Sequence, residues 1–174
     1  MGINNRTRLQ PDALTKGWAS TELETADLGG VYESLDGKVY RLVELNMDPD
    51  GDDDVTSVAQ YDACSYVCDD VTKGYSVTTD LSDGDAGLFA GAIQSTTSPG
   101  QDGRLFIQTR GLGRINTDVS VSTIDCGDAY ILSDYGVLDI EASASNDVAA
   151  KAAKSQTGQS TGISARFAYI LGIV

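Results

Sequence analysis

The chain has 174 residues, which is enough for one domain whose hydrophobic core needs no disulfide bonds. Its net charge is -14, and because an acidic surface repels nucleic acid and anionic membranes, we predict neither as a partner. The sequence has no histidine and no Walker A motif, which removes the commonest general base and the usual nucleophile triads. We therefore predict a protein that is not an enzyme and needs no cofactor. A Ser–Lys or paired-carboxylate enzyme is the remaining alternative.

Residues 1–25 differ in character from the rest of the chain, because the first twenty residues hold three basic side chains and one acidic side chain. Two interpretations are open: a frayed terminus, or an arm that leaves the domain and docks on a neighbour. The contact candidates of such an arm are Arg6, Arg8, Leu14 and Trp18. Trp18 is the only tryptophan and would be the natural anchor. We divide the chain into an N-terminal arm, 1–25, and a single β domain, 26–174.

Short runs of β-branched and aromatic residues, separated by Gly, Asp and Ser, follow the arm and predict antiparallel strands joined by turns. Asp36-Gly37 between two such runs predicts a hairpin. The expected strands lie at 31–34, 39–43, 66–68, 75–78, 88–93, 105–110, 130–132, 137–140 and 163–174. The last of these is expected to complete the sheet or to pair with another subunit. Gly111-Leu112-Gly113 predicts a turn, because it lacks the third glycine of a dinucleotide-binding motif.

Helical structure is expected in two short pieces at most. A helical turn is predicted within 55–66, and a short helix is predicted over 147–154, where Ala and Lys favour a helix. The second piece could equally be a strand. The fold class predicted from the residues is therefore all-β and mainly antiparallel, with at most one short helix.

The acidic run Asp48 to Asp54 is the most conspicuous local feature. Asp48, Asp50 and Asp52 imitate the opening of an EF-hand loop, but Asp53 stands where the loop needs glycine and Ala59 where it needs glutamate. We predict an exposed acidic loop and no metal site, with a calcium site at Asp48, Asp50 and Asp52 as the weaker alternative.

The three cysteines, Cys64, Cys68 and Cys126, do not form a disulfide scaffold, since their number is odd. One disulfide bond and three reduced thiols are both open interpretations, and without histidine they make a poor zinc set. No apolar leader follows Met1, and no run is long enough to span a membrane. We expect a chain that is made and used in a cytoplasm, or is built there into something larger.

Several short sequence motifs in the second half of the chain resemble those of a known protein family. Thr-x-Gly at 109–111 is followed by Gly-Asp-x-x-x-x-Ser-x-x-Gly-x-Leu at 127–138, Asp-Val-Ala at 147–149 and an apolar terminal strand. The small-residue run at 86–91 precedes this block. Over roughly residues 65–174, the pattern resembles the small capsid decoration (cement) proteins of tailed bacteriophages.

This resemblance implies a compact β-barrel or β-sandwich that sits on the outside of the virion head, often as a trimer. It implies a function without chemistry: binding the major capsid protein and itself, and stabilising the capsid lattice after assembly in the host cytoplasm. In the terminal strand the contact candidates are Arg166, Phe167 and Tyr169. The alternatives are another virion part, such as a head-fibre base, head–tail or tail protein, or a secreted β module that binds Ca²⁺ or glycans.

Overall fold

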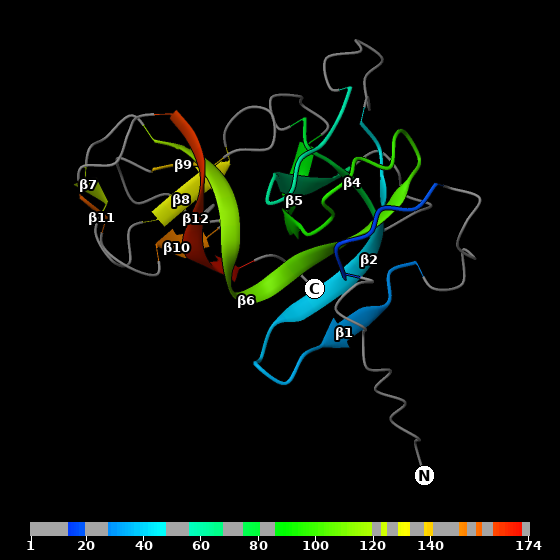
Figure 1. Cartoon of the computed structure of the whole chain (residues 1–174), viewed down its shortest axis with the longest axis horizontal. Coiled ribbons are helices and arrows are strands. Elements are labelled where there is room, and N and C mark those ends of the chain that lie inside the picture. The colour runs from blue at the N-terminus through cyan, green and yellow to red at the C-terminus, as the bar shows by residue number, and fades with distance from the viewer. Residues whose placement is uncertain are drawn as a thin grey trace.

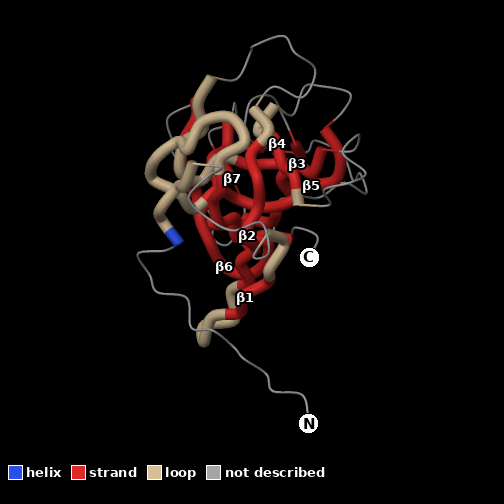
Figure 2. Tube along the Cα trace, turned by 90° about the vertical axis from the view of Figure 1, so that its right-hand side faces the viewer, coloured by secondary structure: helices blue, strands red, loops and turns tan. Residues whose placement is uncertain are grey.

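The computed structural model of the chain describes residues 14–19, 28–47, 56–67, 75–80, 86–119, 123–124, 129–132, 138–140, 150–152, 156–157 and 162–171. Every element within these ranges is a β-strand, and the only helical residue is Leu14 (Figure 2). The all-β prediction is confirmed. The helical turn predicted within 55–66 is absent from its described part, where irregular chain leads into a strand. Within 147–154, residues 150–152 form a strand, which is the alternative that the sequence left open.

The first half of the chain forms a closed five-stranded barrel. Its strands are β2 (Val39–Leu45), β3 (Ala63–Val67), β4 (Ser76–Thr78), β5 (Ala86–Ile93) and β6 (Arg104–Val119), and the short strand β1 (Val31–Glu33) pairs with β2 outside the circuit. The strands pair in the order β2-β4-β3-β5-β6, and β6 pairs again with β2, which closes the barrel (Figure 1). The pairs are antiparallel except β2–β4. The expected compact β-barrel is therefore present, in its mainly antiparallel form.

The predicted hairpin forms β1 and the start of β2. Val31 pairs with Arg41 and Glu33 with Val39, while Gly37 takes a φ of 78° in the turn between them. Glycine has no Cβ and adopts this left-handed conformation without strain, which is why Asp-Gly favours tight hairpins. β1 has no second neighbour in the sheet, so the hairpin projects from the barrel (Figure 1).

The second half of the chain forms another closed circuit of strands. Its members are β8 (Ala129–Leu132), β9 (Leu138–Ile140), β10 (Ala150–Ala152), β12 (Gly162–Leu171) and β6 itself. The order is β6-β12-β10-β8-β9, and β9 returns to β6 in a parallel pairing at Leu138 and Thr117. Two further strands, β7 (Thr123–Ile124) and β11 (Gln156–Thr157), form a separate two-stranded sheet. The last strand completes the sheet, as expected.

β6 belongs to both circuits and bends between them (Figure 1). Its first half pairs with β2, and from Arg110 to Val119 it pairs with β12. Gly111 lies at the change with a φ of 98°, where a Cβ would be 3.2 Å from the Cα of Lys38. The turn predicted at Gly111-Leu112-Gly113 is therefore wrong: the glycine bends a continuous strand where the hairpin packs closely against it.

The barrel interior is apolar. Val43 and Leu45 of β2, Leu105 and Ile107 of β6, and Ile93 of β5 are fully buried in one cluster. They point inward because side chains two residues apart on a strand share a face. Each contributes about 1.5–3 kcal/mol to stability by leaving water.

The outer face of β2 and β6 carries a second, smaller cluster. Tyr40, Leu42 and Phe106 are buried there, and Leu14 and Trp18 from the N-terminal segment pack over them. Described residues of the N-terminal segment therefore lie on the chain's own barrel and close one of its faces.

Candidate functional site

Successive side chains of β12 point to opposite faces of the sheet, so the contact residues predicted on this strand do not share one face. Phe167 and Tyr169 are 39% and 51% exposed, whereas Arg166 is only 3% exposed. Nε of Arg166 donates a hydrogen bond to Oγ1 of Thr117 at 2.8 Å. Arg166 therefore does not present its charge at the surface of this chain, contrary to its place among the predicted contact residues.

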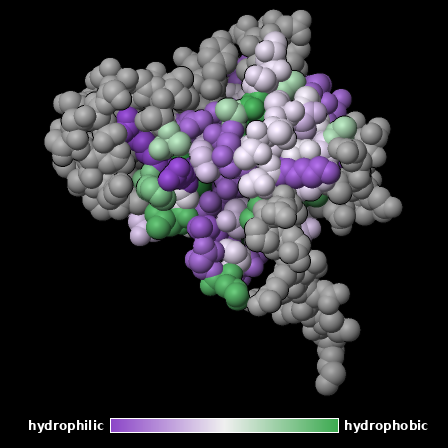
Figure 3. All heavy atoms as spheres, in the orientation of Figure 1, coloured by the Kyte–Doolittle hydropathy of each residue, from purple (hydrophilic) through white to green (hydrophobic). Residues whose placement is uncertain are grey.

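The exposed side of β12 continues onto β6. In the antiparallel register Phe167 lies opposite Arg114, and Tyr169 lies opposite Leu112. Directly opposite residues of two paired strands point to the same face of the sheet. The resulting β6–β12 face consists of Arg110, Leu112, Arg114, Phe167, Tyr169 and Leu171, all of which are exposed. In Figure 3, hydrophobic and hydrophilic side chains meet at the lower left of the coloured surface, where Figure 1 places these strands.

Arg114 is held in this face by aromatic rings. Its guanidinium carbon lies 4.8 Å from the ring centre of Phe167 and 6.0 Å from that of Tyr61. Each ring attracts the positive charge electrostatically, which restrains a side chain that would otherwise be mobile. Among the described residues, no carboxylate lies within ion-pair distance of Arg114 or of Arg110. The two cations of the face are therefore not neutralised by a described acidic side chain.

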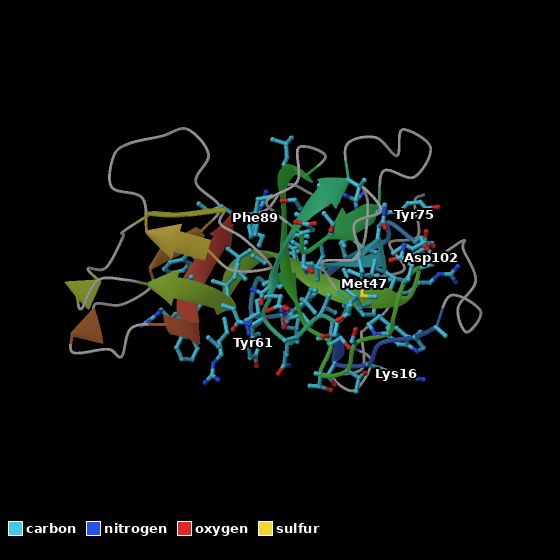
Figure 4. The ribbon with its side chains drawn as sticks, turned by 90° about the horizontal axis from the view of Figure 1, so that it is seen from above. Lys16, Met47, Tyr61, Tyr75, Phe89 and Asp102 are labelled. Carbon is cyan, nitrogen blue, oxygen red and sulfur yellow. The ribbon has the colours of Figure 1, made fainter. Side chains whose placement is uncertain are left out.

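An open cleft of about 400 Å³ begins at Arg114 and runs between β6, β12 and the β1–β2 hairpin. We call it the hairpin cleft. Figure 4 shows Tyr61, one of its lining residues, on the side of the barrel next to the second circuit. The cleft is lined by Asp36, Lys38, Tyr40, Tyr61, Gln94, Gln108, Leu112, Gly113, Arg114 and Phe167. Its volume is within the range of sites that bind small ligands or single side chains.

Of the three charged side chains in the described lining of the hairpin cleft, two form an ion pair with each other. Nζ of Lys38 lies 2.8 Å from Oδ2 of Asp36, and the hydroxyl of Ser34 also donates to Asp36. These two bonds lower the pKa of Asp36 to about 2, and the bond to Asp36 raises the pKa of Lys38. Burial raises the pKa of Tyr40 above its ordinary value of 10.0, so its phenol adds no charge to the cleft at pH 7. Lys38 is neutralised by Asp36, and no described carboxylate neutralises Arg114, so the described lining of the cleft carries a net positive charge.

Gly113 determines how the Gln108 side chain lines the cleft. A Cβ at this position would be 2.5 Å from Oε1 of Gln108, so only glycine lets the Gln108 amide fold over the strand. Nε2 of Gln108 donates to the carbonyl oxygens of Arg110 at 3.2 Å and Gly111 at 3.3 Å. These bonds fix the bent part of β6 and with it the place where Arg114 leaves the strand.

The arm residues have a different place. Trp18 forms an isolated bridge with Arg104: its N–H donates at 2.9 Å and its carbonyl accepts at 2.7 Å. Its ring meets Phe106 edge-on at 5.9 Å. Leu14 and Trp18 are partly buried on their own barrel, so they offer a neighbour little area. Arg6 and Arg8 lie outside the described residues.

The metal and thiol predictions fall largely outside the described residues, which include none of Asp48, Asp50, Asp52, Cys68 and Cys126. Cys64 is a free, fully buried thiol. Its Sγ donates to the carbonyl of Gly91 at 3.3 Å. Within the described ranges, no group of three or more His, Cys, Asp or Glu side chains is placed to hold a metal ion.

Sequence reasoning found Phe167 and Tyr169 but missed Leu112, Arg114 and the cleft. Leu112 was assigned to a turn, although the strand continues through it. The available signal was alternation: Leu112 and Arg114 are two residues apart and so share a face once the strand is recognised.

The comparisons with family models and with curated proteins add no relative. No family model matches the sequence, and the comparison with curated proteins found no significant match. No helix in the described part of the chain is long and apolar enough to cross a membrane. We therefore infer the function of the protein from its fold and from the β6–β12 face.

Proposed function

We propose that the protein is a non-enzymatic structural component of a virion, which binds the outer surface of a tailed-phage capsid and stabilises its lattice. The observation that carries the proposal is the exposed β6–β12 face. Aromatic residues and arginine are enriched where proteins bind each other, and this face combines Phe167 and Tyr169 with Arg110 and Arg114. The resemblance of residues 65–174 to capsid decoration proteins supplies the partner, the major capsid protein.

The rigidity of the face supports a docking function. β6 and β12 pair over ten consecutive residue pairs, from Gly162–Val119 to Leu171–Arg110. A face built on two long paired strands holds its side chains in fixed positions, which lowers the entropy lost on binding. The barrel on one side and the second circuit on the other support this pair of strands. A homotrimer, which the resemblance also implies, would multiply the contact with a symmetric shell.

The first test is the gene neighbourhood, where the proposal expects portal, protease and major capsid genes. Capsids assembled from that major capsid protein, expanded and lacking this chain, are then mixed with the purified protein. We expect saturable co-sedimentation and added density on the outer surface in electron micrographs. A chain that stays monomeric and does not bind these capsids would overturn the proposal, and density at a tail or neck would reassign it to another virion part.

The β6–β12 face is tested with a matched pair of variants. The double variant Leu112→Ser, Tyr169→Ser removes apolar area from the face, and we expect capsid affinity to fall at least about tenfold. The control is Leu88→Ser on β5, where Leu88 is 63% exposed and lies outside the face. Equal losses in both variants would show that the face is not the docking surface.

A further inference from the structure

Within the described part of the chain, the guanidinium of Arg114 contacts two aromatic rings and no carboxylate. A guanidinium carries five N–H donors in one plane, and the rings of Phe167 and Tyr61 attract its charge without satisfying those donors. Asp36, the acidic residue of the hairpin cleft, is already bound to Lys38 at 2.8 Å. Arg114 is therefore restrained by its neighbours, charged, and still able to bind an acceptor in the cleft.

The chemistry of the cleft selects among anions. The planar guanidinium matches a carboxylate, which it can bind through two parallel hydrogen bonds. The carboxylate of Asp36 stands in the same cleft, so a doubly charged phosphate would meet more repulsion than a singly charged carboxylate. Leu112 and Phe167 give the cleft an apolar wall for the carbon chain that bears the carboxylate. A short acidic side chain on an apolar stem fits these conditions.

The hairpin cleft and the β6–β12 face share residues, and this overlap indicates which protein supplies the carboxylate. Leu112, Arg114 and Phe167 belong both to the face and to the lining of the cleft. A protein that covers the face must therefore also close the mouth of the cleft. The cleft is open to solvent, so a side chain from this partner has access to it.

We propose that the hairpin cleft receives an Asp or Glu side chain of the protein that covers the β6–β12 face, with the carboxylate bound to Arg114. This inference rests on the proposed function, because the covering protein is its capsid partner. Arg114 supplies the paired donors, Phe167 and Tyr61 hold the guanidinium in place, and Leu112 contacts the stem. The cleft thus makes docking selective for an acidic residue at one position of the partner.

The direct test uses the full chain and two short peptides, N-acetyl-Gly-Glu-Gly-amide and its Gln counterpart. In an NMR titration, the Glu peptide should shift the Arg114 Nε–Hε signal in a saturable way, and the Gln peptide should bind at least about tenfold more weakly. Arg114→Gln should abolish the difference between the peptides, and Arg114→Lys should keep part of it. Lys16→Gln should preserve it, because Lys16 is exposed and lies outside both the β6–β12 face and the cleft lining.

Two outcomes would overturn the inference: equal binding of the Glu and Gln peptides, or an unchanged preference in Arg114→Gln. Glucuronate forms a third arm of the titration. If it saturates the Arg114 signal while the Glu peptide does not, the cleft is a site for acidic sugars and the proposal fails. Arg114 is exposed, so the variants should fold, and matching thermal melts of variant and wild type check this.

Capsid binding separates this inference from the proposed function. If the capsids bind and Arg114→Gln binds them as tightly as the wild type, the cleft proposal fails and the proposed function stands. If the Glu peptide binds but the capsids do not, the proposed function fails and the carboxylate site stands. When both are correct, Arg114→Gln should weaken capsid binding about tenfold or more, and added salt should affect the variant less than the wild type.

Discussion

Asn116 on β6 donates a hydrogen bond from Nδ2 to Oδ1 of Asp62 at 2.8 Å, and so ties the turn before β3 to the strand that both circuits share. The same nitrogen donates to the carbonyl of Gln60 at 3.2 Å, and the Asn116 N–H donates to the carbonyl of Tyr61 at 2.7 Å. Tyr61 itself takes a φ of 74°, which is uncommon for a residue other than glycine. Asn116 thereby holds Tyr61 where its ring reaches Arg114.

Replacing Asn116 with alanine should destabilise the protein by about 1–3 kcal/mol, because partly buried acceptors on Asp62 and Gln60 lose their donor. Urea denaturation at pH 7 measures the loss. Asn46→Ala is the control, since the Asn46 side chain accepts a solvent-exposed bond from Gln101 at 2.8 Å. A loss in Asn116→Ala no larger than in the control would contradict the assigned role.

The pH dependence of stability should carry a contribution from Asp62. Burial raises the pKa of Asp62 above its usual value, although the bonds from Ala59 and Asn116 oppose this. The folded state therefore binds this proton more tightly than the unfolded state, so the charge costs stability above the folded pKa, and the cost disappears as the pH falls through that value. The wild type should gain stability relative to Asp62→Asn as the pH falls from 7 to 3. Denaturation of both proteins across this range checks the sign.

Local patterns predicted the parts of the fold that depend on a few neighbouring residues. The Asp36-Gly37 hairpin depends only on the residues around its own turn. The antiparallel pair β8–β9 depends only on two short runs that are close in sequence, so both features were recognisable. The bend at Gly111 was not, because the residue that leaves little room for a Cβ there is Lys38, more than seventy residues earlier in the chain. A glycine with positive φ occurs in turns and at strand bends alike, and sequence does not separate the two.

The faces of β12 show the same limit for the candidate site. Arg166 and Phe167 are neighbours, and the usual expectation places the aromatic ring inside and the charge outside. The register with β6 decides otherwise: Arg166 points to Thr117 in the interior, and Phe167 points outward. Because a shift of one residue exchanges the two faces, only the pairing partner could reveal which residues meet a ligand.

Gly91 marks a close approach inside the barrel. A Cβ there would be 2.4 Å from the carbonyl oxygen of Gln108, so Gly91→Ala must push β5 away from β6. We expect a loss of at least about 1–3 kcal/mol from this overpacking. Gly100→Ala is the matched control: Gly100 has a φ of 82° but free space around its Cα, so only backbone strain of about 1–2 kcal/mol remains. Urea midpoints should fall further for Gly91→Ala.

The Asp36–Lys38 ion pair should measurably lower the pKa of Asp36 but contribute little to the free energy of unfolding of the protein. Asp36 should titrate near pH 2, and Lys38→Met should raise its pKa toward the ordinary value of 3.8. The stabilisation is present above the unfolded pKa and is lost as the pH falls through about 2. Because the pair is exposed to solvent, its removal should cost less than about 1 kcal/mol at pH 7. Carboxyl NMR signals and thermal melts measure the two effects separately.

Trp18 provides an optical probe for the N-terminal segment. It is the only tryptophan, and its ring contacts Phe106 edge-on at 5.9 Å. Phe106→Leu should shift the Trp18 emission to longer wavelength and increase quenching by acrylamide, because the ring loses its cover. Leu88→Ser, on the separate strand β5, should leave the emission unchanged. Unaltered emission in Phe106→Leu would place Trp18 elsewhere.

The shared strand β6 imposes an order on synthesis. Residues up to Arg110 contain all the pairings that close the barrel, whereas the second half of β6 meets its long partner only when 162–171 have been made. During translation, this half of β6 is therefore an unpaired sheet edge next to a barrel whose strands have all been made. Open edges recruit other strands, so a chain that stops before β12 should aggregate while keeping its barrel folded. β12 therefore covers the open edge of β6, and stop codons that remove residues 162–171 should reduce soluble yield.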